Sequence, residues 1–224
     1  VTNQELFLRA NKEFHGGNYG QALKDYEAVT HKASAVLYNM GICLCKLGNF
    51  AQALAYFKRA ARIATRSTIN DILENGDRAE RILQVYKEPT VREMGVRFLR
   101  SLVAGTSLLQ WQIMLLLVLY MSLLGMWRSK KRLLRILLWF FVILCFMGLV
   151  PILVIKWTDE YVLTGIVLPQ SMVVYSGPYH HCHQQGMLTS GYEVTVKQKQ
   201  NGWYKIQYDT IIGWIPEDSL APTI

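Results

Sequence analysis

The segment Tyr179–His183, which holds three histidines and one cysteine, contains the residue types best suited to chemistry. Imidazole and thiolate groups are ligands for zinc or copper. Neighbouring residues point in different directions, however, and one short segment rarely surrounds an ion without a partner segment. The rest of the sequence has no recognisable catalytic motif and no glycine-rich phosphate loop. We therefore predict no metal, no cofactor and no enzymatic activity, with metal binding by this segment as the alternative.

A second group of candidate residues lies in an internal repeat at the N-terminus. An offset of 31 residues aligns Gly17-Asn18-Tyr19 with Gly48-Asn49-Phe50, and Ala22 with Ala53. Aromatic and alanine residues at these spacings share one helical face, and the small alanine lets two helices approach closely. Residues 1–88 are thus expected to form paired helices, closed by a helical cap over Ile69–Tyr86.

This pattern resembles the tetratricopeptide repeat (TPR), most clearly in the second copy, which has Leu37, Gly41, Leu47, Gly48, Phe50, Ala53, Phe57 and Ala60. The resemblance implies an all-α module that binds proteins on its concave face, here Phe7, Asn11, Phe14, Tyr38, Asn39 and Ile42. Asn11 and Asn39 match the asparagines with which some family members hold a terminal carboxylate, but Phe7 replaces the lysine of that clamp. Carboxylate recognition, and simple packing of Phe7 and Phe14, are the alternatives.

Two uncharged stretches of twenty residues, Leu108–Trp127 and Ile136–Ile155, dominate the middle of the chain. Each would make a helix of about 30 Å, the thickness of a bilayer core. Neither has the polar stripe of a soluble helix. The sequence therefore predicts a transmembrane helical hairpin over 107–157, preceded by a linker or interfacial helix over 89–106.

The loop 128–135 between these stretches is strongly basic. Such short basic loops stay in the cytoplasm, which would place both ends of the chain in the periplasm. We expect a two-pass protein of the bacterial inner membrane that contacts lipid. A nucleic-acid patch is the alternative, but two spans leave it little reach, so we predict no nucleic-acid partner. The basic residues are Arg128, Lys130, Lys131, Arg132 and Arg135.

Residues 158–224 change to short β-rich runs, and Asn201-Gly202 is a strong hairpin signal. About five strands are expected: 165–167, 172–175, 192–198, 203–208 and 211–215. The segment resembles the bacterial SH3 family through Gly191, Val194, Val196, Trp203, Lys205, Ile206, Gly213, Trp214 and Ile215. That resemblance implies a small all-β SH3-like barrel that binds peptidoglycan or peptides. Trp203, Tyr204 and Trp214 are its candidate aromatic surface, with barrel packing as the alternative.

The whole chain is thus expected to be a multidomain membrane protein with three parts: repeat, hairpin and barrel. This order resembles the BatE family of the Bacteroides aerotolerance (Bat) group. The resemblance implies a scaffold in an inner-membrane assembly with von Willebrand A-domain proteins, served by a MoxR-type AAA+ ATPase. Its implied biology is envelope maintenance, aerotolerance and tolerance of oxidative stress. A cell-wall sensor or anchor that binds peptidoglycan is the alternative function.

Overall fold

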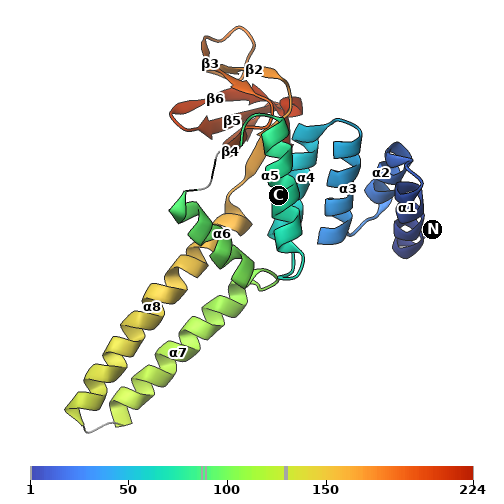
Figure 1. Cartoon of the computed structure of the whole chain (residues 1–224). Coiled ribbons are helices and arrows are strands. Elements are labelled where there is room, and N and C mark those ends of the chain that lie inside the picture. The colour runs from blue at the N-terminus through green and yellow to red at the C-terminus, as the bar shows by residue number, and fades with distance from the viewer. Residues whose placement is uncertain (1, 87, 89, 129–130, 224) are drawn as a thin grey trace. The chain divides into compact units, whose positions relative to one another are not determined.

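The computed structural model describes residues 2–86, 88, 90–128 and 131–223. Contacts between elements divide the chain into two compact units (Figure 1). One unit comprises residues 1–88 together with residues 162–224, and the other comprises residues 89–161. The first unit therefore joins two stretches that are 73 residues apart in the sequence.

Paired helices make up the N-terminal part of the first unit, here called the helical repeats. They are α1 (Asn3–His15), α2 (Tyr19–Ala28), α3 (Ser34–Lys46), α4 (Phe50–Arg62) and α5 (Ile69–Ile82). As the internal repeat predicts, α1 packs on α2 and α3 on α4, and α5 then covers α4 as the expected cap. Gly17 and Gly48 have φ angles of 81° and 83°, a left-handed conformation that ends the first helix of each pair.

Small residues let the helices of each pair approach closely. Ala22 and Ala53 are fully buried beside the large buried rings of Tyr26 and Phe57. At Gly41 the approach is closest, because an added Cβ atom would lie 2.6 Å from the ring of Phe57. The spacing of small and aromatic residues thus sets how the helical repeats pack.

Antiparallel strands form the C-terminal part of the first unit, here called the β-domain. They are β1 (Thr164–Val167), β2 (Ser171–Tyr175), β3 (Gln184–Thr189), β4 (Glu193–Gln200), β5 (Trp203–Tyr208), β6 (Ile211–Pro216) and β7 (Leu220–Pro222). Their order in the sheet is β3-β2-β6-β5-β4-β1-β7. Five of these strands fall where the sequence predicts them, whereas β3 and β7 are additional. Asn201 and Gly202, with φ angles of 49° and 76°, form the expected turn between β4 and β5.

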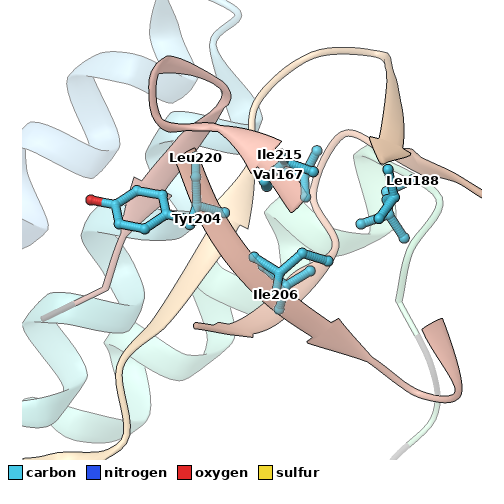
Figure 2. Packing of buried hydrophobic residues seen from close by; sticks show 8 residues of the cluster. Val167, Leu188, Tyr204, Ile206, Ile215 and Leu220 are labelled. Carbon is cyan, nitrogen blue, oxygen red and sulfur yellow. The ribbon is translucent and has the colours of Figure 1, made fainter. Parts of the chain in front are cut away.

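The core of the β-domain is one apolar cluster between the strands (Figure 2). Val167, Leu188, Tyr204, Ile206, Ile215 and Leu220 are labelled in that view. Gly213 lies where β6 passes β2, and an added Cβ atom would be 2.4 Å from Val174 and 2.6 Å from the carbonyl oxygen of Tyr175. Gly213 therefore permits a close backbone approach between β6 and β2.

The second unit consists of α6 (Val91–Val103), α7 (Leu108–Arg128) and α8 (Arg132–Tyr161) in the described residues. The segments Leu108–Gly125 and Ile136–Thr158 are long and apolar enough to cross a membrane. Only 11% of the first segment and 17% of the second are buried, whereas the core helix of a soluble protein is mostly buried. Helix α8 continues to Tyr161, past the expected end of the hairpin at residue 157.

Candidate functional site

The six residues expected on the concave face lie on α1 and α3, and all six are partly buried. Phe7 and Phe14 contribute to packing within the first pair of helices. Their ring centroids lie 6.0 Å from Tyr26 and 5.5 Å from Tyr19, respectively. Part of each phenylalanine remains exposed, so the same side chains can pack the repeats and line a binding face.

Asn11 and Asn39 meet at the hydroxyl group of Tyr26, which comes from α2. This hydroxyl donates to Oδ1 of Asn11 at 2.6 Å and accepts from Nδ2 of Asn39 at 3.1 Å. The same Nδ2 lies 3.5 Å from Oδ1 of Asn11. Burial raises the pKa of Tyr26, so its hydroxyl keeps its proton and remains a donor. The result is a closed polar triad of one phenol and two amides.

Carboxylate recognition by Asn11 and Asn39 would compete with the hydrogen bonds of this triad. Because α1 and α3 are both 13 residues long and begin 31 residues apart, the equivalent of Asn11 is Ile42, not Asn39. The two amides therefore stand at non-equivalent positions of α1 and α3, and both already bond to Tyr26. A terminal carboxylate would have to displace the phenol to use both.

A second polar contact extends this face onto α5. Nδ2 of Asn75 donates to the hydroxyl of Tyr38 at 2.9 Å. The Tyr38 ring lies 5.9 Å from that of Phe57, which holds it in place. Asn75 and Tyr26 are not among the residues that the sequence predicts for this site. Asn75 could have been found from the position of α5 in the chain. This helix follows α4 where the first helix of a third pair would stand, and first helices line the concave face.

An ion pair fixes the other side of α1 against α2. Nε and Nη2 of Arg9 donate to the Asp25 carboxylate at 2.8 and 2.7 Å. The Asp25 side chain is only 4% exposed. The hydrogen bond from Arg9 holds the pKa of Asp25 below its ordinary value, despite the opposing effect of burial. This bidentate pair positions α1, and with it three residues of the concave face.

The three aromatic residues expected on the β-domain surface are largely buried. Trp203 and Tyr204 are each 9% exposed, and Trp214 is 8% exposed. Tyr204 belongs to the core cluster and donates through its hydroxyl to Glu217 at 3.2 Å. Little of these rings is therefore available at the surface, as the packing alternative expects.

The histidine-rich segment lies between β2 and β3 and contacts one of these rings. His180 covers Trp203 edge-on at a centroid distance of 4.7 Å, and Tyr175 approaches Trp203 at 5.7 Å. Tyr179 stacks on His181 at 5.3 Å. Over the described part of the chain, no three His, Cys, Asp or Glu side chains are grouped to hold a metal ion. The geometry is that of an aromatic cluster.

The helical repeats and the β-domain are joined by side chains from α4. Nη2 of Arg62 donates to the carbonyl oxygen of Val162 at 3.3 Å and to the hydroxyls of Thr164 and Thr223 at 3.2 and 3.4 Å. It thus holds both ends of the β-domain, where β1 begins and β7 ends. At Gly191, an added Cβ atom would lie 2.8 Å from Leu83, so the chain after α5 also packs closely against the β-domain.

Lys58 adds an ionic link across the same contact. Its Nζ lies 3.0 Å from Glu80 on α5 and 3.2 Å from Glu193 on β4. Burial disfavours both charged forms, but the attraction between the groups outweighs it. The pKa of Lys58 is therefore raised, and the pKa of Glu193 is lowered. The sequence does not predict this contact between the two modules.

The basic residues of the loop 128–135 lie at the end of the α7–α8 hairpin. Arg128 ends α7 and Arg132 begins α8, and the side chains of both are exposed, as is that of Lys131. Lys130 lies outside the described residues, and Arg135 is placed only as part of α8. The described cations therefore gather where the two candidate spans meet, as the sequence predicts.

Comparison with known families supports the two modules. Residues 34–64, which cover α3 and α4, match the tetratricopeptide repeat, and residues 171–221 match the bacterial SH3 domain. No curated protein and no solved structure matches the chain. The chain thus has a helical N-terminal region with a TPR, two helices able to span a membrane, and an antiparallel sheet consistent with an SH3-like domain. Protein binding is the activity that such modules suggest.

Proposed function

We propose that this chain is a non-enzymatic, membrane-anchored scaffold that presents two joined binding modules. The observation that carries the proposal is the single compact unit formed by the TPR and SH3-like regions, with the hairpin inserted between them in sequence. A hairpin with a short turn suits an anchor. In the described parts of both spans the one charged side chain is Lys156, near the C-terminal end of the second span. An ion pathway would be expected to have ionisable side chains within the spans.

The proposed location is the bacterial inner membrane, with both modules in the periplasm. Two crossings return the chain to its starting side, and the basic turn is expected to stay in the cytoplasm. The contacts of Arg62 and Lys58 with the β-domain support the placement of both modules on one side of the membrane.

The proposed setting is a Bat-type assembly. In it, von Willebrand A-domain membrane proteins would bind the periplasmic modules, and a MoxR-type ATPase could reach only the basic turn. The role would be envelope maintenance under oxidative stress. Support comes from the order of the three parts rather than from a diagnostic motif. Co-purification from native membranes tests it, and recovery of the chain without A-domain proteins would contradict it.

The concave face is the proposed site for the protein partner. We expect Ile42→Arg to reduce partner recovery strongly, because Ile42 lies on the expected face beside the polar triad and is only partly buried. Gln52→Arg is the matched control, since it adds the same charge at an exposed position on α4. Equal recovery with both variants would remove the concave face from the proposal but leave the scaffold in place.

Peptidoglycan binding is the second candidate function, and the match to the bacterial SH3 domain favours it. Sedimentation of the full chain in detergent with purified sacculi separates the two functions. The scaffold requires no binding, whereas an anchor requires saturable binding. The Tyr175–His180–Trp203 cluster is the part of the β-domain to change first, through His180→Ala.

A further inference from the structure

Among the described residues, helix α6 has a stripe of apolar side chains that remain exposed. The residues are Val91, Met94, Phe98 and Leu102, with exposures of 82%, 50%, 62% and 39%, and they are here called the α6 stripe. Their spacings of three and four residues place them along one line of the helix. Exposed apolar residues scattered singly need no explanation, but an ordered stripe on a short helix does.

The α6 stripe is one half of a broader apolar sector. The other half consists of Val96, Leu99 and Val103, which are more buried; Val103 is only 2% exposed. Helix α6 also packs against α8. At about 100° per residue, Arg97 and Arg100 project from the opposite side of the helix. Helix α6 thus has one wide apolar sector, half buried and half open, and a polar sector that includes Arg97 and Arg100.

The corner between α6 and α7 fixes where this sector lies along the hairpin. Gly105 has a φ angle of 80° and ends α6, so α6 and α7 do not form one continuous helix. Lys156 of α8 donates through Nζ to the carbonyl oxygen of Thr106 at 2.7 Å. Trp111 of α7 donates through Nε1 to the Thr106 hydroxyl at 2.8 Å. The corner is therefore bonded to both candidate spans.

Lysine and tryptophan are the residue types that gather at the boundary between lipid and water. Their convergence on Thr106 is the arrangement expected where a hairpin leaves the hydrocarbon. Figure 1 shows α6 turning away from the direction of α7 and lying against the end of α8. The α6 stripe thus lies on the helix that directly precedes this corner.

We propose that α6 is an interfacial helix whose exposed stripe inserts among the headgroups and upper acyl chains of the bilayer that α7 and α8 cross. The combination of a wide apolar sector and a polar sector that includes two arginines is typical of helices that lie in the plane of a membrane surface. A second copy of the chain is a weaker occupant, because four side chains are few beside the roughly 20–30 residues per partner of a stable interface. The inference rests on the membrane hairpin but not on partner binding.

Photo-crosslinking of the full chain tests this inference. We would place p-benzoylphenylalanine at Phe98, in the stripe, and separately at Arg100, in the polar sector, and reconstitute each variant in phosphatidylethanolamine–phosphatidylglycerol vesicles. Mass spectrometry then measures the fraction of chains bonded to lipid. We expect about fivefold or more lipid adduct from position 98 than from position 100, because only the stripe reaches the acyl chains. Leu116→p-benzoylphenylalanine, at a 64% exposed position of α7, is the positive control.

Each other outcome counts against the inference. Adducts between two chains from position 98 would identify the stripe as a contact between copies. Equal lipid labelling at positions 98 and 100 would mean that α6 has no fixed orientation at the surface. Lipid adducts at Leu116 but not at Phe98 would overturn the interfacial helix while leaving the anchor intact. Loss of lipid adducts at both Leu116 and Phe98 would overturn the inference together with the membrane hairpin.

Discussion

Tyr26 has two separate roles in the helical repeats, one for its ring and one for its hydroxyl. The fully buried ring fills the space between α1, α2 and α3, and the hydroxyl joins the amides of Asn11 and Asn39. The ring could be expected from the repeat pattern, because an aromatic residue recurs at this position in both copies. The hydroxyl contact could not, since the second copy has Phe57 there.

Replacing Tyr26 with phenylalanine separates these roles. The ring stays, but both amides lose their bond to the phenol and keep only their 3.5 Å contact with each other. Tyr26→Phe should therefore lower the free energy of unfolding by about 1–3 kcal/mol. Urea denaturation of the full chain in detergent, followed by circular dichroism, measures the loss. Tyr56→Phe, at a partly buried position on α4, should change stability by less than about 0.5 kcal/mol. A similar loss in both variants would indicate that the triad adds nothing specific.

Two glycines of the helical repeats should respond to alanine with opposite signs. At Gly41 the new methyl group would lie 2.6 Å from the rigid, buried ring of Phe57, so Gly41→Ala should destabilise the repeats by about 1–3 kcal/mol. At Gly20, within α2, nothing lies within 4 Å of the added atom, and Gly20→Ala should stabilise by about 0.5–1 kcal/mol. Thermal unfolding of the two variants side by side checks the sign. Stabilisation by Gly41→Ala would contradict the close approach of α3 and α4.

At the scale of elements, a segment was predictable where its own composition decides its structure. Helices α7 and α8 follow from uninterrupted apolar residues, and the β4–β5 turn follows from Asn201-Gly202. Strand β3 was missed because Gln184–Thr189 has no apolar alternation: Leu188 is buried, whereas Met187 is 64% exposed. Pairing with β2, rather than its own residues, makes this segment a strand.

The ionic link between α4 and β4 should make stability depend on pH in the acid range. The pKa of Glu193 is lowered from its ordinary 4.5 in the folded chain. Its contribution is therefore complete above about pH 4.5 and is lost as the pH falls through the lowered value. The pKa of Lys58 is raised above its ordinary 10.5, so its contribution is present below that value and lost in strong alkali. Between these limits the link is intact.

Glu193→Gln should remove part of the acid sensitivity. The side chains of Lys58 and Glu193 are 33% and 41% exposed, so water screens the pair and the effect should stay below about 1 kcal/mol. The measurement is the shift of the unfolding midpoint between about pH 5.5 and pH 3.5, in the full chain and the variant. Asp218→Asn, at an exposed position of the β-domain, should leave that shift unchanged. An unaltered shift in Glu193→Gln would show that another carboxylate carries it.

At the scale of the whole molecule, the three parts could be predicted but the union of two of them could not. Each part has a signal within its own sequence: a repeat, two apolar runs or alternating strands. The contacts of Lys58 and Arg62 with the β-domain join residues more than 90 positions apart. No local periodicity encodes such an approach, because the two surfaces meet only after both modules have folded.

This union requires both modules to lie on the same side of the membrane, and the basic turn is expected to decide which side that is. If the turn stays in the cytoplasm, protease added to spheroplasts should reach the helical repeats, whereas protease added outside inverted membrane vesicles should not. Replacing the turn's cations with glutamine should weaken this orientation and yield a mixed population. The residues to change are Arg128, Lys130, Lys131 and Arg132.

The matched control changes four exposed cations of the helical repeats, Lys12, Lys24, Lys46 and Arg66. Net charge then falls equally in both variants, but only the turn lies next to the spans, where positive charge sets orientation. The control should therefore keep the protease pattern of the unaltered chain. Since the two modules form one unit, both should change sides together, and fragments with only one module protected should be absent. Protection of the repeats in unaltered spheroplasts would reverse the proposed orientation and place the modules in the cytoplasm.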